Sequence, residues 1–495
     1  MKYLLALDQG TTSSRAILFN EKGAIAAQDG SEFPQIYPRP GWVEHDPADI
    51  LDTQIASMRG AVKRAGIDPA DIAAIGIANQ RETTLIWDRK TGQPIANAIV
   101  WQCRRTAPIV EQLKSDGFGS IIRDRTGLIP DAYFSGTKIT WILENTPGAQ
   151  ERADRGELCF GTVDSFLAWH LTKDHAHVTD ATNAARTMLY DIHKGDWDDL
   201  LLRALNIPRS ILPRVVNSSE IVGVTNRDLL GAEIPVAALA GDQHAALYGQ
   251  ACFTPGMVKN TYGTGGFMLL NTGFTPVRSQ HGLITTIAWQ LNGKPVYALE
   301  GSVFVAGAAV QWLRDEMQLV KTAQETEQIA FSIPDTGGVY LVPAFAGLGA
   351  PWWDMYARGT IVGLTRGSGR AQIVRATLES IAWQTGDVLN VMAQDSGLKP
   401  TVLRADGGAS RNGFLMQFQA DILGVTVLRP AITETTALGA AMLAGRAVGL
   451  WDEKQMSAIN PPEARFTPAL SGAERERRSR DWHRAVERAR GWAEE

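Results

Sequence analysis

A chain of 495 residues with 44% hydrophobic residues, 20% charged residues and a net charge of -5 has the composition of a globular protein. Its length exceeds what one core usually supports, which favours two large domains, and its mildly acidic balance argues against nucleic acid as a partner. The opening MKYLLAL reaches Asp8 too soon for a signal peptide, and no apolar run approaches the roughly 18 residues of a membrane span. We therefore expect a cytoplasmic protein without a membrane span.

The first segment predicts a β-hairpin whose turn has unusual hydrogen-bonding capacity. Two apolar runs, KYLLAL and AILFN, flank DQGTTSSR, which extends from Asp8 to Arg15. Closure of a turn needs one or two special residues, whereas this one has a carboxylate, a glycine and four hydroxyl groups. Amides and hydroxyls of such a turn can bind phosphate, and the carboxylate can hold Mg²⁺ directly or through water. A polar hairpin tip is the simpler interpretation.

Apolar runs rich in β-branched residues alternate along the chain with segments of helical pattern. Strands interleaved with helices indicate an α/β chain built around mixed sheets. The predicted strands are 72–78, 83–88, 234–240, 339–344 and 401–406, and predicted helices include 244–251 and 414–423.

Charged residues follow two of these strands. Arg81 and Glu82 come after strand 72–78, and such a pair can bind a vicinal diol, because the guanidinium donates to hydroxyl oxygens and the carboxylate accepts hydroxyl hydrogens. A surface ion pair is the alternative. Asp242 follows strand 234–240 and opens a helix, where it is either a functional carboxylate or a helix N-cap. His244 is interpreted as a packing residue of the first turn.

A second hairpin, 257–272, repeats the layout of the first about half a chain later. Its turn is Tyr262-Gly-Thr264-Gly-Gly266, and a third glycine element, 406–409, lies where a strand ends and a helix begins. Together these turns could enclose a nucleoside triphosphate between two domains of similar plan, 1–250 and 251–495. The chain has no GxxxxGK[ST] loop, no GxGxxG fingerprint and no protein-kinase motif set, which disfavours the commoner nucleotide folds.

The cysteines and the C-terminal tail suggest structural roles. Cys103, Cys159 and Cys252 are an odd number at scattered positions, so we expect buried reduced thiols. The tail begins with a capping pattern at Ser471 and predicts a docked helix. Its apolar face is expected to comprise Trp482, Ala485, Val486, Ala489 and Trp492.

The motifs DQGTTSSR, NQRETT, VWQCRRT, AGDQ and YGTGG together resemble the FGGY family of carbohydrate kinases, in the actin-like ATPase superfamily, and within it the glycerol kinases. Segments 133–145 and 359–379 are similar to the two signatures of that family, and the resemblance extends to about residue 450. It implies an α/β fold of two actin-like (ribonuclease H-like) domains around a central cleft, each with a five-stranded mixed sheet flanked by helices. It also implies ATP-dependent phosphorylation of glycerol to sn-glycerol 3-phosphate, with ATP and Mg²⁺ as cofactors, in a homodimer or homotetramer.

The resemblance also assigns roles to individual residues. Asp242 matches the catalytic base, and Asp8 and Asp242 match carboxylates that help to position Mg²⁺. The residues that match the glycerol site are Arg81, Glu82, Tyr133, Asp242 and Gln243, with Trp101 and Phe267 as pocket walls. Those that match the nucleotide site are Thr11, Thr12, Ser13, Arg15, Thr264, Gly307, Gln311 and Ala409. Gly307 and Gln311 are four residues apart, so a helix would place them on one face. A domain hinge is expected near residue 250.

Two positions depart from the family pattern. Gly413 stands where relatives often have an Asn that contacts the nucleotide, so no side-chain hydrogen bond is expected there. Glu233 stands where some bacterial relatives carry an Arg that binds the inhibitor fructose 1,6-bisphosphate. Because a carboxylate repels phosphate, we expect this inhibition to be absent or weak.

Two other functions remain as alternatives. Another FGGY kinase, acting on a pentulose or a four-carbon polyol, would have similar nucleotide loops, although the pair Arg81 and Glu82 with Tyr133 argues for glycerol. An actin-like filament or chaperone ATPase would hydrolyse ATP without an acceptor, and would leave the pairs Arg81–Glu82 and Asp242–Gln243 without a function.

Overall fold

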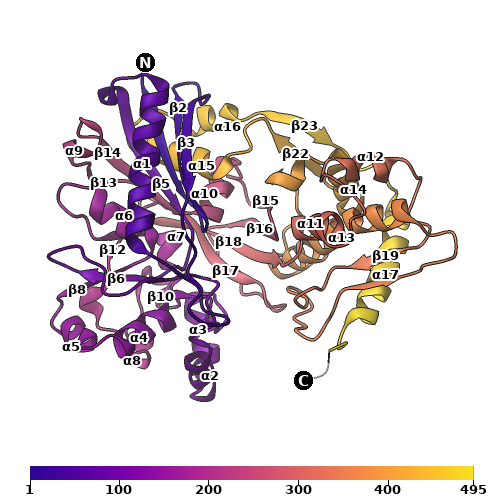
Figure 1. Ribbon diagram of the computed structural model, residues 1–495, viewed down its shortest axis with the longest axis horizontal. Coiled ribbons are helices and arrows are strands. Elements are labelled where there is room, and N and C mark those ends of the chain that lie inside the picture. Colours follow the sequence, from indigo (N-terminus) through magenta and orange to yellow (C-terminus); the bar gives the residue numbers. More distant parts are fainter. Residues whose placement is uncertain (494–495) are drawn as a thin grey trace.

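The computed structural model describes residues 1–493, which form two α/β domains, each around one mixed sheet (Figure 1). In the first sheet the strand order is β13-β14-β5-β1-β2-β3. Its central strand β1 runs antiparallel to β2 and parallel to β5, which is in turn parallel to β14. The strands are β1 (Tyr3–Gln9), β2 (Ser13–Asn20), β3 (Ile25–Glu32), β5 (Ile72–Asn79), β13 (Ser219–Val224) and β14 (Pro235–Gly241).

The second sheet repeats this plan. Its strand order is β17-β18-β16-β15-β21-β22-β23, and β15 runs antiparallel to β16 and parallel to β21. The strands are β15 (Met257–Tyr262), β16 (Gly266–Gly273), β17 (Ile284–Leu291), β18 (Lys294–Val303), β21 (Val402–Asp406), β22 (Thr426–Pro430) and β23 (Pro462–Phe466).

Both sheets contain the same five-stranded unit, which confirms two domains of similar plan. In chain order the five strands are β1, β2, β3, β5 and β14 in the first unit and β15, β16, β18, β21 and β22 in the second. The expected count of five strands per sheet is wrong, however, because the sheets have six and seven. The additional strands β13, β17 and β23 each pair antiparallel with an outer strand of a unit, so they extend it without changing its order.

The first strand is apolar from Leu4 to Leu7 because both faces of its sheet are covered there. Leu5 and Leu7 pack on the side of α1 (Pro47–Ala65), whereas Leu4 and Ala6 pack on the side of α15 (Thr435–Ala447). Successive side chains of a strand point to opposite faces, so a strand covered on both sides needs apolar residues at every position.

Two helices lie between the two sheets, and small residues bring them together. α10 (Asp242–Gly249) follows β14 and packs against α15, which comes from the second half of the chain but contacts β1, β5 and β14 of the first sheet. A β-carbon on Gly249 would lie 2.1 Å from the carbonyl oxygen of Thr435. The hinge near residue 250 and the boundary between 1–250 and 251–495 remain predictions.

Much of the segment between β5 and β14 forms a lobe with its own core below the first sheet in Figure 1. The lobe contains α4 (Ser135–Asn145) and the short α7 (Ala181–Ala184), whereas α6 (Val163–Leu171) packs into the core of the first sheet. All three cysteines are buried and unpaired, as predicted. Across residues 1–493, every helix is too short or too polar to cross a bilayer.

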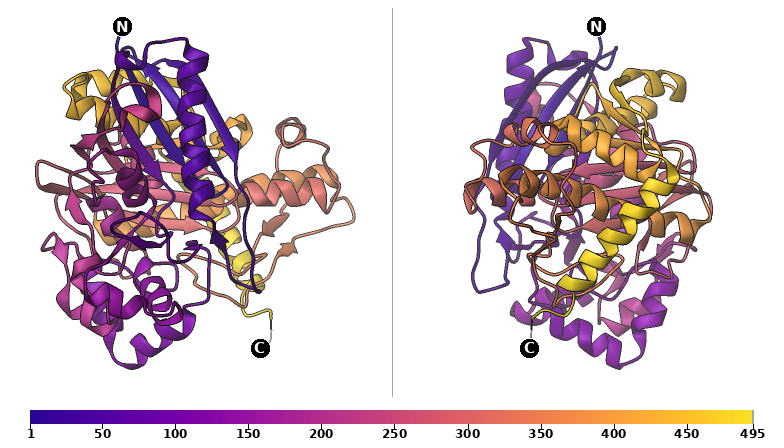
Figure 2. Two further views of the ribbon diagram at one scale, coloured as in Figure 1. Left: turned by 60° about the vertical axis from the view of Figure 1, so that its left-hand side comes forward. Right: turned by 90° about the vertical axis from the view of Figure 1, so that its right-hand side faces the viewer.

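The C-terminal helix α17 (Gly472–Ala489) crosses the outer side of the second domain, where it joins the core formed with α13 (Arg370–Ser396) (Figure 2). The Ser471 hydroxyl accepts a hydrogen bond from the Glu474 amide, and Trp482, Ala485, Val486 and Ala489 are buried as predicted. The prediction for Trp492 is wrong. This residue lies beyond the end of the helix and is 71% exposed, so the helical period does not extend to it.

Candidate active site

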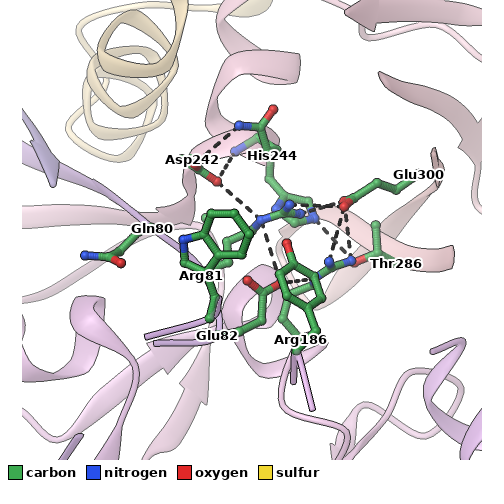
Figure 3. Close-up of polar contacts among 12 residues, drawn as sticks. Gln80, Arg81, Glu82, Arg186, Asp242, His244, Thr286 and Glu300 are labelled. Atoms are coloured by element: carbon green, nitrogen blue, oxygen red, sulfur yellow. Dashed lines mark hydrogen bonds and ion pairs between the residues drawn. The ribbon is translucent and has the colours of Figure 1, made fainter. Parts of the chain in front are cut away.

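The centre of the candidate site lies at the carboxyl ends of two neighbouring parallel strands. β5 ends at Asn79, just before Arg81, and β14 ends at Gly241, just before Asp242. Asn79 and Gly241 are partners in the ladder, so the residues that follow them meet. The Nε of Arg81 lies 3.3 Å from Oδ1 of Asp242 (Figure 3).

Burial excludes the simpler interpretation of the Arg81–Glu82 pair. Arg81 is 3% exposed and Glu82 is 1% exposed, so a surface ion pair is wrong. Glu82 has a φ of 61°, in the left-handed region that few non-glycine residues adopt. Such backbone strain is often found at functional sites, where surrounding contacts hold it in place.

Asp242 is not the N-cap of its helix. Gly241 occupies the N-cap position, and Asp242 is the first residue of α10. The Asp242 carboxylate accepts a hydrogen bond from the Gln243 amide at 2.7 Å, and its side chain is 29% exposed. An accessible carboxylate beside a buried guanidinium is available to a ligand. His244 is buried in the first turn, as predicted, with its Nε2 3.3 Å from the Thr286 hydroxyl.

The second domain contributes a carboxylate that the sequence analysis missed. Nη1 and Nη2 of Arg81 donate to the two oxygens of Glu300 at 2.6 and 3.0 Å. Glu300 lies on β18 and is separated from Arg81 by 219 residues. The sequence did contain one indication of this residue. Glu300 is the sole charged residue in the mostly apolar run VYALEGSV.

Arg186, just after α7, completes this buried group. Its Nε donates to Glu82 at 2.6 Å, and its Nη2 lies 3.2 Å from Glu300 (Figure 3). Burial alone would raise the pKa of Glu300, but the charges of Arg186 and Arg81 hold it below its usual range. Burial raises the pKa of Glu82 despite the same two cations. Nothing in the sequence pattern had singled out Arg186.

Two aromatic residues of the predicted glycerol site lie together beside this group. The rings of Trp101 and Tyr133 meet edge to face, with centroids 5.5 Å apart, and the guanidinium of Arg186 lies 5.6 Å from the Tyr133 ring. The indole nitrogen of Trp101 donates to the hydroxyl of Thr11 at 2.9 Å, which joins the aromatic wall to the first turn.

The other predicted pocket wall, Phe267, lies on the same sheet face as Glu300. Phe267 pairs with Ser302, which is two residues from Glu300 along β18. Paired residues and residues two apart on a strand share a face, so Phe267 and Glu300 face the same side of the sheet.

Gln243 is held from the second domain. Lys259, on β15, donates from Nζ to Oε1 of Gln243 and, at 2.9 Å, to the hydroxyl of Thr261. The amide nitrogen of Gln243 is consequently directed away from Lys259, and lies 3.3 Å from Oδ2 of Asp242. Burial lowers the pKa of Lys259 to about 8. The sequence analysis had not selected Lys259.

The first turn carries a three-residue ion network. Arg15 pairs with Asp8, its neighbour across the hairpin, and its Nη1 also donates to Glu434 at 2.7 Å. Burial raises the pKa of Asp8, and the charge of Arg15 opposes this only in part. Thr11 and Thr12 lie at the tip between β1 and β2, and Ser13 is the first residue of β2.

The remaining predicted nucleotide residues line one cavity of about 300 Å³ in the second domain. Thr264 is in the second turn, and Gly307 and Gln311 are in α11 (Gly307–Asp315), on one face as expected. The amide of Gly307 donates to the carbonyl of Gly263 at 2.9 Å, so the helix starts directly on the turn. Ala409, after β21, also lines this cavity.

Gly413 lies next to the same cavity, directly after Asn412 and in contact with Glu327. The Gly413 amide donates to Oε1 of Glu327 at 2.8 Å, and a β-carbon on Gly413 would lie 2.6 Å from that oxygen. Glu327 and Asn412 both line the cavity. Glu327 therefore occupies space that a larger residue at 413 would need.

The carboxylates present fit Mg²⁺ that arrives with a nucleotide. Asp8 on β1 pairs with Ala78 of β5, which pairs with Ala240 of β14, two residues before Asp242, so both carboxylates lie at the same edge of the sheet. Within residues 1–493, no group of three or more His, Cys, Asp or Glu side chains is arranged to hold a metal ion. Mg²⁺ usually binds one or two carboxylates together with substrate phosphates and water, which matches a pair better than a protein cage.

Comparisons with known proteins agree with this geometry. The FGGY family of carbohydrate kinases matches in its N-terminal domain over residues 3–249 and in its C-terminal domain over residues 258–448. The chain is 61% identical to glycerol kinase 2 of Thermotoga maritima over 493 residues, 99% of each chain. It is 60% identical to glycerol kinase of Caldanaerobacter subterraneus subsp. tengcongensis over the full length of both chains.

Solved structures show the same fold. The structure of Plasmodium falciparum glycerol kinase with ADP superposes with a TM-score of 0.94 at 37% identity, covering 99% of this chain and 98% of the other. Xylulose kinase from Lactobacillus acidophilus, at 24% identity and a TM-score of 0.88, covers 98% and 97% and shares the fold. Family matches over both halves, full-length relatives at about 60% identity and the two-domain architecture lead to one conclusion: the chain belongs to the FGGY family of carbohydrate kinases.

Proposed function

We propose that this protein transfers the γ-phosphoryl group of ATP to a terminal hydroxyl of glycerol, giving sn-glycerol 3-phosphate and ADP. The observation that carries the proposal is the buried pair Arg81 and Glu82 directly beside the accessible carboxylate of Asp242. This arrangement offers donors and acceptors for a diol next to a group that can accept a proton. The full-length relatives named glycerol kinase support the same substrate.

Glycerol binds with its vicinal hydroxyls at Arg81 and Glu82 and its carbon chain against Trp101, Tyr133 and Phe267. Aromatic walls favour the carbon atoms and a small set of polar groups fixes the orientation, as is usual for small-molecule sites. A site that hydrogen-bonds substrate hydroxyls rejects molecules that lack them, because its buried polar groups would be left unpaired. The specificity for glycerol thus depends on the buried charges.

Asp242 acts as the general base that takes the proton from the attacking hydroxyl. General-base catalysis typically contributes about 10² to 10⁴ in rate, so most of the acceleration comes from alignment and charge stabilisation. Gln243 lies beside Asp242 and binds the same end of the substrate. The partial exposure of Asp242 supports this role, since a base must reach its substrate.

The two Gly-Thr turns hold the phosphates of ATP between the domains. Amides and hydroxyls at Thr11, Thr12 and Ser13 act from one side and Thr264 from the other, while Arg15 stabilises charge on the γ-phosphoryl oxygens. When bound, Mg²⁺ held by Asp8 and Asp242 would neutralise part of the phosphate charge. Domain closure excludes water, which otherwise competes as the acceptor.

The adenosine end of ATP occupies the cavity of the second domain. Gly307, Gln311 and Ala409 line it, and its volume of about 300 Å³ suits part of a nucleotide, with the phosphates extending toward the turns. The ADP named with the Plasmodium falciparum structure supports an adenine nucleotide as the second substrate.

Acceptor-dependent release of ADP from Mg-ATP tests the proposal. We expect glycerol to give by far the highest kcat/KM among glycerol, dihydroxyacetone, erythritol and xylulose, with little ADP when no acceptor is present. A higher value for xylulose or erythritol would keep the family but overturn glycerol as the substrate. Equal ADP release without an acceptor would overturn the kinase function itself.

A further inference from the structure

The glycerol-binding arginine is held by a carboxylate that belongs to the other domain. Arg81, Glu82, Arg186 and Glu300 form one buried group of two cations and two anions, each 3% exposed or less (Figure 3). Glu300 is the member that comes from the second sheet, through β18. The group therefore crosses from the first domain to the second.

Glu300 has no capacity left for a ligand. Its two oxygens accept from both terminal nitrogens of Arg81 at 2.6 and 3.0 Å, and from both terminal nitrogens of Arg186 at 3.3 and 3.2 Å. Two guanidinium forks on one carboxylate fix the planes of both side chains, since bidentate pairs specify geometry as well as adding binding energy. Glu300 consequently acts on other residues and not on the substrate.

Without Glu300, Arg81 has a competing partner in the site. Its Nε is already 3.3 Å from Asp242, while its distance to Glu82 is 3.9 Å. A guanidinium released from Glu300 would turn its terminal nitrogens toward these two carboxylates. Arg81 would then leave the orientation that meets a diol and would pair more closely with Asp242.

We propose that Glu300 is a positioning residue, which orients Arg81 toward the secondary hydroxyl of glycerol and keeps its terminal nitrogens away from Asp242. This inference rests on the proposed phosphorylation of glycerol. Selection for the second hydroxyl of the substrate is thus set by the second domain, although Arg81 and Glu82, which hydrogen-bond the substrate, belong to the first. Arg186 supports the same geometry by filling the remaining acceptor positions of Glu300.

The discriminating experiment compares glycerol with 1,3-propanediol, which lacks the secondary hydroxyl. The ratio of kcat/KM for the two acceptors measures how strongly the site uses that hydroxyl. In Glu300→Gln the ratio should fall at least about tenfold, through a higher KM for glycerol and a lower kcat, with the KM for ATP unchanged. In Glu300→Asp, which keeps the charge but reaches less far, the fall should be smaller.

A matched control is available in the same domain. Glu379 is also buried, and it pairs with Arg375 at 2.8 Å within α13, outside the described site. Glu379→Gln makes the same chemical change and should leave the ratio at its wild-type value even if thermal stability falls. A merely structural role for Glu300 would make the two Gln variants behave alike.

Each outcome decides the proposal. A folded Glu300→Gln protein with a wild-type ratio overturns it. If Glu300→Gln does not fold, Glu300→Asp decides, and a wild-type ratio in that variant overturns it equally. Absence of glycerol phosphorylation in the wild-type protein would instead overturn the proposed function, which keeps the two failures distinct.

Discussion

Gly439 in α15 lies so close to α10 that a β-carbon on Gly439 would come within 1.8 Å of the carbonyl oxygen of Ala245. Helices usually pack with their axes about 8 to 10 Å apart, and a backbone approach of this kind requires a residue without a side chain. The two helices between the sheets are therefore joined through backbone contact, at the point where the two domains meet.

Gly439→Ala and Gly386→Ala should shift stability in opposite directions. An Ala at 439 would force α10 and α15 apart, and overpacking of this kind costs about 1 to 3 kcal/mol of unfolding free energy. Gly386 lies inside α13, where a β-carbon would be 3.5 Å from its nearest neighbour, so Ala there should add about 0.5 to 1 kcal/mol. Urea denaturation of both variants measures these changes, and equal effects would contradict the backbone contact.

Asp242→Asn should separate turnover from binding. The amide keeps the size of the carboxylate and can still accept from Nε of Arg81, but it cannot take a proton from the acceptor hydroxyl. We expect kcat to fall about 10²- to 10⁴-fold, with the affinity for glycerol, measured by calorimetry, changed little. Turnover close to that of the wild type would remove Asp242 from the role of general base.

Gln311→Ala should weaken nucleotide binding without affecting the acceptor. Gln311 lines the cavity of the second domain, and loss of one neutral hydrogen bond typically costs about 0.5 to 1.5 kcal/mol, or about 2- to 13-fold in KM for ATP. Gln328 is exposed and outside the cavity lining, so Gln328→Ala is the control. An unchanged KM for ATP in Gln311→Ala would place the nucleotide elsewhere.

The attachment of the C-terminal helix should depend on pH. Nε2 of His483 lies 2.8 Å from Asp387 on α13, and the hydrogen bond to that carboxylate raises the pKa of His483 above 6.5. The charges that face it are those of Asp387 and, on its own helix, Glu487. A raised pKa in the folded state adds stability below the unfolded pKa, and this stability is lost as pH rises through the folded value.

His483→Gln should therefore destabilise the protein more at about pH 5.5 than at about pH 8.5. The difference in unfolding free energy between wild type and variant, measured by urea denaturation at both pH values, tests this. A difference that is equal at both pH values, or larger at the higher one, would contradict a charged pair between His483 and Asp387.

Fructose 1,6-bisphosphate at millimolar concentration should leave the activity unchanged. Glu233 is exposed and forms an ion pair with Lys173 at 3.1 Å. The positive charge of Lys173 is therefore already balanced by a carboxylate and is less available to a phosphate. A carboxylate repels a phosphate, with a force that is weakened but not abolished by solvent. Strong inhibition in the steady-state assay would show that other groups bind the bisphosphate.

The sequence was sufficient for the parts of the site that depend on local order. A strand ending in Asn79 places Arg81 and Glu82 at a sheet edge, and a strand ending in Gly241 does the same for Asp242. Glycine and hydroxyl residues between two apolar strands define each Gly-Thr turn for the same reason. These features can be predicted from the sequence because the conformation of a strand and of the turn that follows it depends on residues only a few positions away.

The tertiary structure decided which of these residues act together. Glu300 meets Arg81 across 219 residues and Arg186 meets Glu82 across 104, and no local pattern encodes contacts over such separations. The same limit explains why a surface ion pair at Arg81, an N-cap at Asp242 and a buried position for Trp492 were wrong. Burial and the ends of helices depend on the segments that pack nearby. Local residue patterns and motifs were enough to predict the main strands, the turns and the family. Only the packing of the two sheets around α10 and α15 brings Glu300 of one domain against Arg81 of the other.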